Sequence, residues 1–313
     1  MSNSAYSLFP IKYPTLYEYY EKQRDAFWVP AEVDLADDIK DWRDKLNDQQ
    51  KTFITYILAF FAQADGIVLE NIEENFSLDI DIAEFKIFYG IQSGIEAIHW
   101  EMYSILIDTL INDSELKSKA FQAIQHYPSI KKKADWMKKW MTNDEPYLHR
   151  LIAFACAEGI YFSSSFAGIF YFKKKGLLSG LVLSNKFIAR DEGLHRDFAL
   201  EAVNVLKKEG RILEDDVVYT IVKEAVDIEM EFVKESLQVE LIGMNSEQMC
   251  QYVKYVADHL LSTIHLKKLY NVSNPFDWMN MISMTNKQNF FEGRVSEYKK
   301  NNKQLEFNFD SDF

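Results

Sequence analysis

The chain has 313 residues, a formal net charge of −13, 48% hydrophobic residues and 15% aromatic residues. This composition supplies a large packed core, whether the chain forms one domain or two. The negative charge argues against nucleic acid as a partner, because phosphate binding needs clustered Lys and Arg. The short lysine runs at 131–133, 138–139 and 173–175 are expected to be solvated. Only 11 glycines and 6 prolines are present, which favours long helices.

Two cysteines, Cys156 and Cys250, are too few for a disulfide framework. Cys156 lies in an apolar run and is expected to be a small buried residue. No stretch approaches the charge-free length of a membrane span, and the N-terminus lacks the pattern of a signal peptide. We therefore expect a cytoplasmic protein with no membrane partner.

Helical periodicity dominates the chain. Several predicted helices have about 30 residues, or about 45 Å at 1.5 Å per residue, which is typical of bundle helices. We predict an all-α fold with a four-helix core and extra flanking helices. The predicted helices cover 13–26, 35–46, 47–76, 81–111, 113–126, 129–141, 145–174, 178–208, 213–239 and 245–266.

Two of the six histidines, His99 and His195, each follow a glutamate by three residues, after Glu96 and Glu192. At this spacing both side chains project from one face of a helix and can bind one ion. A single Glu-x-x-His motif is weak evidence. Glu96, however, lies in the apolar run IFYGIQSGIEAIHWEMYSILI, where an unpaired carboxylate would cost several kcal/mol to bury. The remaining histidines lack such surroundings: His126, His149, His259 and His265.

Two further acids, Asp65 and Glu158, stand alone in apolar helices. Asp65 precedes Glu96 by 31 residues and Glu158 precedes Glu192 by 34, so each half of the chain pairs one carboxylate helix with one Glu-x-x-His helix. Ferritin-like proteins with two iron or manganese ions use this arrangement. A zinc site would show more His or Cys. The alternative is a set of core acids paired with Lys or Arg, but cations are missing from the segments around Asp65, Glu96 and Glu158.

Tyr103 follows His99 by four residues and Glu96 by seven, which places its ring on the ligand face one turn further along. A phenol beside an oxygen-activating metal pair can be oxidised to a radical. Phe162 and Phe166 lie four and eight residues beyond Glu158, and could line an apolar pocket for that phenol. Taken alone, these two phenylalanines are more often simple core residues.

These motifs, together with FWVPAEVDLADD, KFIARDEGLHRDFA, NFFEGRVSEY and the terminal FNFDSDF, resemble the small, radical-generating subunit of class I ribonucleotide reductase. The matching segments keep the family's order from about residue 15 to residue 313. The resemblance implies a ferritin-like fold and a stable radical on Tyr103, which is passed to a separate large subunit that reduces ribonucleotides to deoxyribonucleotides. It also implies two metal ions, usually iron, while a dimanganese centre would use the same ligands. Those ligands would be Asp65, Glu96, His99, Glu158, Glu192 and His195.

The resemblance further implies a homodimer and a radical-transfer route. Asp191 would orient the far nitrogen of His99, Trp28 would hydrogen-bond to Asp191, and Tyr298 would be the next relay. One residue departs from the family pattern: Trp100 follows His99, where relatives usually carry a small residue. Its indole is expected to point off the ligand face.

The C-terminal segment 299–313 is polar but contains three phenylalanines set among acids, Phe307, Phe309 and Phe313. A purely solvating tail has no use for such residues. We therefore expect a helical domain over 1–298, followed by a flexible tail that docks to the large subunit. A bland tail is the alternative.

Two other functions fit the six predicted ligands. Another ferritin-like oxidase or hydroxylase would need neither the Trp28–Asp191 relay nor a docking peptide. A non-enzymatic metal-binding or iron-storage protein would have no use for Tyr103 or Tyr298. The chain shows no thiol pair for reducing a nucleotide by itself.

Overall fold

The computed structural model describes residues 7–142, 144–238 and 244–279. Within these ranges the regular elements are all helices and there is no β-strand, which confirms the all-α prediction. Residues up to Pro275 form one unit, and the described residues 276–279 belong to a second unit. The predicted domain boundary at 298–299 lies outside the described residues.

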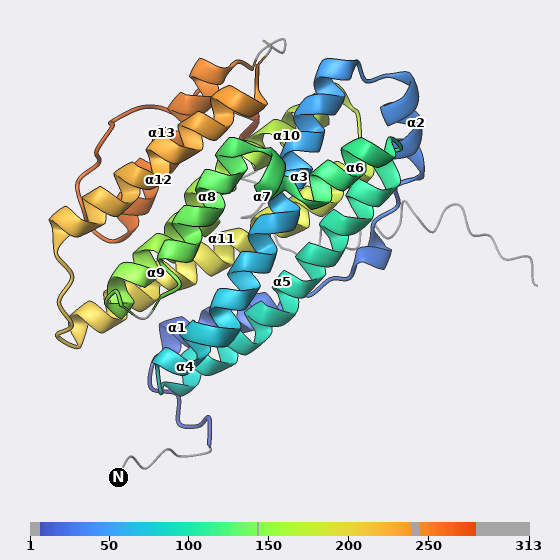
Figure 1. The fold of residues 1–313 in the computed structure, drawn as a ribbon. Helices are drawn as coiled ribbons and strands as arrows, with labels where there is room; N and C mark the ends of the chain where they lie inside the picture. Colours follow the sequence, from blue (N-terminus) through green and yellow to red (C-terminus); the bar gives the residue numbers. More distant parts are fainter. Residues whose placement is uncertain (1–6, 143, 239–243, 280–313) are drawn as a thin grey trace, which may run out of the picture. The chain divides into compact units, whose positions relative to one another are not determined.

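Four long helical stretches form the core. They are α3 (Asp48–Asn71), α5 (Ala83–Leu110), α11 (Ser179–Lys208), and α9 (Tyr147–Cys156), which continues through the π-helix η3 (Ala157–Tyr161) into α10 (Ser163–Lys175). Helix α3 packs mainly against α5, and α11 packs mainly against α9 and α10. Figure 1 shows α3 and α5 running side by side.

The remaining helices surround this core. Helix α1 packs against α5 and α11, while α12 packs against α8, α9 and α13. The predicted helix 113–126 is two short helices, and the predicted helix 47–76 ends in a second π-helix. The flanking elements are α1 (Pro14–Asp25), η1 (Pro30–Glu32), α2 (Ala36–Asp44), η2 (Ile72–Phe76), α4 (Ser77–Asp79), α6 (Ser114–Phe121), α7 (Ala123–His126), α8 (Pro128–Lys139), α12 (Asp215–Ser236) and α13 (Ser246–Thr263).

Local sequence explains several helix ends. The side chain of Asn47 accepts a hydrogen bond from the Gln50 amide at 2.9 Å, and the Gln50 side chain accepts one from the Asn47 amide at 3.1 Å. This reciprocal capping box starts α3. Helix α10 ends at Gly176, whose φ of 66° is the left-handed conformation that glycine adopts most easily. The preceding lysines, 173–175, are exposed as predicted and complement the helix dipole.

Helix α8 corrects one prediction. The run 131–133 was expected to be solvated, but Lys133 is fully buried while its two neighbours are exposed. Lys133 lies on the inner face of the helix with Ile130 and Met137, at spacings of three and four residues. Its ammonium group pairs with Glu229 of α12 at 2.7 Å, which a single sequence does not reveal.

The start of α11 is held by α2. Both oxygens of the buried Asp38 carboxylate accept backbone hydrogen bonds, from Gly180 at 2.8 Å and Leu181 at 2.7 Å. A Cβ atom on residue 180 would lie 2.4 Å from the carbonyl oxygen of Asp34, so only glycine permits this approach. These contacts fix the N-terminal end of the helix that carries Glu192 and His195.

Two helical stretches, Asp48–Asp79 and Tyr147–Lys175, are long and apolar enough to cross a membrane by length and composition. The sequence-based expectation concerned charge-free stretches, and a carboxylate interrupts the apolar run of each of these two. In the folded chain, 78% and 100% of their most apolar windows are buried. Each stretch also places a carboxylate in the protein interior, Asp65 in the first and Glu158 in the second. This is the pattern of core helices.

Replacing Asp38 by Ala should lower the free energy of unfolding by about 2 kcal/mol, because two helix N-terminal amides lose their buried acceptor. Asp37→Ala is the matched control, since Asp37 is exposed in the same turn and pairs with Lys40 at the surface. The control should change stability by less than about 0.5 kcal/mol. Urea unfolding of both metal-free variants measures the difference. Equal midpoints would contradict the capping role.

Candidate metal centre

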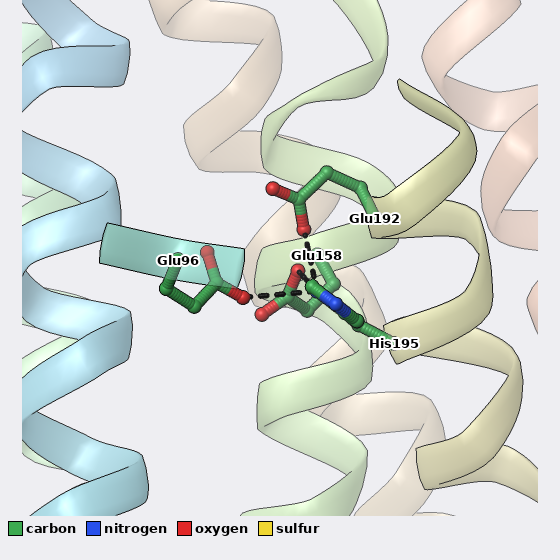
Figure 2. Close-up of side chains that lie close together, drawn as sticks. All are labelled: Glu96, Glu158, Glu192 and His195. Atoms are coloured by element: carbon green, nitrogen blue, oxygen red, sulfur yellow. Dashed lines mark hydrogen bonds and ion pairs between the residues drawn. The ribbon is translucent and has the colours of Figure 1, made fainter. Parts of the chain in front are cut away.

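Four helical stretches bring the six predicted ligand residues together. Each of the six is at most 2% exposed. Their ligand atoms form two groups, within each of which the atoms lie no more than 4.8 Å apart. Figure 2 shows the carboxylates of the larger group directed toward the imidazole of His195. Glu96 belongs to both groups, which are Asp65, Glu96 and His99, and Glu96, Glu158, Glu192 and His195.

Glu96 and Glu192 each face both imidazoles. The two oxygens of Glu96 lie 3.4 Å from Nδ1 of His99 and 2.9 Å from Nδ1 of His195. The two oxygens of Glu192 lie 3.1 Å and 3.3 Å from the same two nitrogens. Two carboxylates that each span two imidazoles have the arrangement of bridging ligands. Glu158 then completes the His195 side, with an oxygen 3.7 Å from Nδ1, and Asp65 groups with His99.

Many of these ligand atoms are buried without a hydrogen-bond partner among the described residues. Such atoms are rare in folded proteins, because desolvating them costs free energy. Here they concentrate at one place and are all atoms that bind first-row metal ions. The residues present therefore fit a pair of divalent cations. The unpartnered atoms are both carboxylate oxygens of Asp65 and Glu158, Oε2 of Glu96, Oε1 of Glu192 and Nδ1 of His99.

Burial and mutual repulsion shape the protonation of the site. Burial raises the pKa of Asp65 and of Glu192 well above the ordinary values, and neighbouring carboxylates raise both further. Burial alone would lower the pKa of His99, but the hydrogen bond to Asp191 and the nearby carboxylate of Glu96 raise it to about 10. Burial opposes charging of His195 too, yet Glu96 and Glu158 raise its pKa to about 9. Without metal ions, protons offset the buried negative charge.

Asp191 lies behind His99. Its Oδ2 is 3.2 Å from Nε2 of His99 and accepts a hydrogen bond of 2.8 Å from Nε1 of Trp28. A proton on Nε2 of His99 leaves Nδ1 unprotonated and directed at the site, as a metal ligand requires. Trp28 is only 2% exposed and packs its ring against Phe187. The three groups predicted to begin the transfer route are thus in contact.

Arg190 was missed by the sequence interpretation. Its guanidinium donates to Oδ1 of Asp191 at 2.8 Å and 3.0 Å, and to the carbonyl oxygen of Ala26 at 2.6 Å. Burial alone would raise the pKa of Asp191, but the charge of Arg190 and the hydrogen bond with His99 hold it below the ordinary value. Arg190 also ties α11 to the segment that carries Trp28. The sequence feature that could have identified Arg190 is its position directly before the two acids Asp191 and Glu192.

Gln92 was also missed. It is fully buried on α5, one turn before Glu96, and its Nε2 donates to Oε1 of Glu96 at 3.2 Å. Its position four residues before a ligand was the available signal, because such residues share a helix face. Gln92 therefore orients one of the two carboxylates that face both imidazoles.

Tyr103 lies in an apolar pocket beside the site. Its hydroxyl is buried and has no hydrogen-bond partner among the described residues. Its ring stacks on Phe61, with ring centroids 4.5 Å apart and an angle of 11° between the planes. The predicted pocket residues Phe162 and Phe166 pack against Phe61 at 5.5 Å and 5.2 Å. Phe61, four residues before Asp65, is the ring that the sequence interpretation missed.

Burial raises the pKa of Tyr103 well above its ordinary value, and the charges of Asp65, Glu192 and Glu96 add to that increase. The phenol is therefore protonated at physiological pH, so that removal of an electron from it must be accompanied by loss of the proton.

Several other residues singled out in the sequence lie away from the site. Trp100 is 48% exposed, in line with the expectation that its indole points off the ligand face. His149 lies near Glu145 and Glu214, in neither group of ligand atoms. Tyr298 and the three tail phenylalanines, Phe307, Phe309 and Phe313, lie outside the described residues.

Comparisons with known proteins agree with this site and fold. A family model described as "Ribonucleotide reductase, small chain" matches residues 5–275. The ribonucleoside-diphosphate reductase small subunit from Dictyostelium discoideum is 48% identical over 299 residues, covering 96% of this chain and 88% of the Dictyostelium protein. The ribonucleoside-diphosphate reductase small chain from Variola virus is 50% identical over 297 residues, covering 95% of this chain and 92% of the viral protein.

Comparison with a solved structure also points to ribonucleotide reductase. The ribonucleotide reductase Rnr4 homodimer from Saccharomyces cerevisiae aligns with a TM-score of 0.80 and 35% sequence identity. The alignment covers 95% of this chain and 91% of the yeast chain. The fold, the family match and the named relatives all identify an oxidoreductase subunit. The chain therefore belongs to the ribonucleotide reductase small chain family.

Proposed function

We propose that this small chain holds two metal ions between the six ligand residues and stores a radical on Tyr103 for use by a large subunit. The large subunit would reduce ribonucleoside diphosphates to deoxyribonucleotides. One observation carries the proposal: two central glutamates each face both imidazoles, beside a buried phenol that has no hydrogen-bond partner in the described part of the chain. One metal ion would lie on the His99 side and one on the His195 side.

A bound pair of oxygen-reactive metal ions supplies the oxidising power. Tyr103 would give one electron to that metal pair and the proton of its hydroxyl group to a carboxylate of the site, and would become a neutral radical. The aromatic rings around Phe61 exclude water and reductants from that radical. The described residues offer the phenol no hydrogen-bond partner, which slows return of a proton to the radical.

We propose that Asp191 links the metal site to the transfer route. Its Oδ2 contacts both His99 and Trp28, and Arg190 holds its other oxygen. Trp28 can give up an electron while its Nε1 proton moves toward Asp191. Tyr298 would be the next relay and the tail with Phe307, Phe309 and Phe313 the docking element. We expect a homodimer, as in the yeast structure described by that name.

We expect two iron ions in each chain, while two manganese ions would use the same ligands. Metal preference depends on residues that hold the ligands, such as Asp191 and Gln92, rather than on the ligands themselves. Elemental analysis of protein from cells supplied with both metals, followed by activity after reconstitution with each, decides between the two ions. Zinc would not support the chemistry, because it has no redox function.

A ferritin-like hydroxylase is the second candidate, and it would need a substrate cavity at the metal pair. A cavity of about 530 Å³ lies instead beside Tyr56, Tyr127 and Glu235, and none of the six ligands lines it. A small cavity of about 20 Å³ near Trp136 and Trp140 also lacks them. Neither cavity favours the hydroxylase, so the radical-storing function is preferred.

Metal loading should release at least two protons from each chain at pH 7, one from each imidazole, with a further contribution from Asp65 and Glu192, whose pKa values are raised well above the ordinary values by burial. The pKa values of His99 and His195 are raised to about 10 and about 9, so both are protonated in the metal-free protein at neutral pH. Both must lose that proton to bind a metal ion, so metal affinity should fall as pH is lowered. Mn²⁺ added anaerobically in weak buffer with a pH indicator measures the release. A His99→Ala/His195→Ala variant should release markedly fewer protons, and equal release from both proteins would contradict this site.

Tyr103→Phe should abolish the tyrosyl radical signal that the oxygen-exposed, metal-loaded protein gives in low-temperature electron paramagnetic resonance. Metal content should stay unchanged, because the phenol is not among the proposed ligands. Tyr89→Phe is the matched control, since Tyr89 is also buried on α5. The control should keep the signal. A signal that survives in Tyr103→Phe would place the radical on another residue.

Deleting residues 307–313 should leave metal content and the radical signal intact but reduce activity with the large subunit by more than about tenfold. The reason is that loss of even one aromatic anchor at an interface commonly costs about 2 kcal/mol. Activity is measured at a low subunit concentration that about half-saturates the full-length protein. Unchanged activity of the truncated chain at low concentration would show that the tail does not dock.

A further inference from the structure

A buried ion pair outside the metal site has no role in the function proposed above. Lys133 of α8 and Glu229 of α12 are both fully buried, with Nζ and Oε2 2.7 Å apart. Such pairs contribute little to stability, because desolvation of two charges offsets their attraction, and an apolar pair of similar volume is often as stable. Their contacts with the rest of the chain therefore point to a more specific role.

Both partners contact the helix that carries Glu158. Nζ of Lys133 donates a hydrogen bond of 2.7 Å to the carbonyl oxygen of Tyr161, the last residue of the π-helix η3. Oε1 of Glu229 accepts a hydrogen bond from the hydroxyl of Ser164, just beyond that π-helix. A π-helix interrupts the regular hydrogen-bond ladder, and groups from other helices can hold its end in place. The ion pair supplies two of them.

The ammonium group is firmly held. It lies 3.3 Å from the centre of the Phe60 ring and 3.8 Å from the centre of the Phe232 ring, where cation–π attraction adds to the ion pair. Burial lowers the pKa of Lys133 to about 8, while the carboxylate of Glu229 opposes that decrease, so the ammonium is largely protonated at neutral pH. The donor to Tyr161 is therefore a fixed charged group.

The carboxylate of Glu158 depends on this backbone. Within the described part of the chain, neither of its oxygens has a hydrogen-bond partner, and one of them faces Nδ1 of His195 across the site at 3.7 Å. Its direction is thus set mainly by the turn from which it projects. Relaxation of the π-helix to an α-helix would shift the register by one residue, which rotates side chains by about 100° around the axis. Such a rotation would turn Glu158 away from His195.

We infer that Lys133, together with Glu229, is a positioning residue that fixes the π-helical turn of η3 and thereby directs Glu158 at the metal ion on the His195 side. This inference rests on the proposed function, because it requires Glu158 to be a metal ligand. The arrangement around His99 is different, because the side chain of Asp191 contacts that imidazole directly. Here the contact acts through the backbone.

The test compares two pairs of substitutions on the same two helices. Lys133→Met/Glu229→Leu removes both buried charges together and leaves no unpaired charge behind. Lys132→Met/Glu231→Leu is the matched control, because Lys132 and Glu231 are also 2.7 Å apart but about half exposed. Mn²⁺ alone is titrated anaerobically into each metal-free protein, and binding of the two ions is followed by calorimetry and electron paramagnetic resonance. A Glu158→Ala variant identifies the ion that depends on Glu158.

The buried double variant should bind the Glu158-dependent ion about 10–100-fold more weakly, the usual effect of losing a group that supports a ligand. Binding of the other ion and the unfolding midpoint of the metal-free protein should stay close to those of the control. Should the buried variant not fold, Lys133→Met/Glu229→Gln, which keeps an acceptor for Ser164, replaces it with the same expectation.

The outcomes separate the two proposals. Fewer than two Mn²⁺ ions bound by the unmodified protein would contradict the dimetal site itself. Two ions bound with unchanged affinity by the buried variant would overturn the positioning role alone. Equal weakening of both ions would indicate a general loss of structure and would also overturn it.

Discussion

Four carboxylates buried together in a helical core are the constraint on which the rest of this structure depends. Burial raises the pKa of Asp65 and Glu192, and both imidazoles take up protons to offset the charge. Two divalent cations would replace those protons and satisfy the unpartnered oxygens. Replacement of protons by metal ions is favourable only if the distances between the ligand atoms are fixed. Long helices joined by short connections fix those distances. Two core helices have the length and apolar composition of membrane spans. The buried carboxylates of Asp65 and Glu158 within them require the arrangement seen at the site.

The ligands are held from behind by residues of other elements. Asp191 holds His99, Arg190 holds Asp191, and the same guanidinium binds the carbonyl of Ala26 in the segment that carries Trp28. A change in charge at a bound metal pair would therefore be transmitted through these hydrogen bonds, from His99 to the N-terminal segment that carries Trp28. Gln92 does the same for Glu96 from within its own helix. The sequence motifs predict the six ligands, while these contacts direct the imidazole of His99 and the carboxylate of Glu96.

Much of this could be predicted from the sequence, because the signals were local. Lone acids in apolar helices pointed to Asp65 and Glu158, and helical spacing pointed to His99, His195 and Tyr103. The remainder depends on tertiary contacts. Lys133 belongs to a lysine run that looks solvated, and only the packing of α8 on α12 buries it. The π-helix around Glu158 is likewise invisible to periodicity, since its end is held by that distant lysine.

Two sets of residues beside the proposed centre, one around Tyr103 and one behind His99, have opposite chemistry, and a radical store needs both. On the Tyr103 side the phenol stacks on Phe61 and lacks a hydrogen-bond partner among the residues described, which isolates a radical. On the His99 side Asp191 contacts an imidazole and an indole through one oxygen, which suits coupled movement of electrons and protons. A hydrogen-bonded Tyr103 would exchange its proton more readily but hold the radical less well. Separate groups for storage and for transfer would let one chain hold an oxidising equivalent and still deliver it.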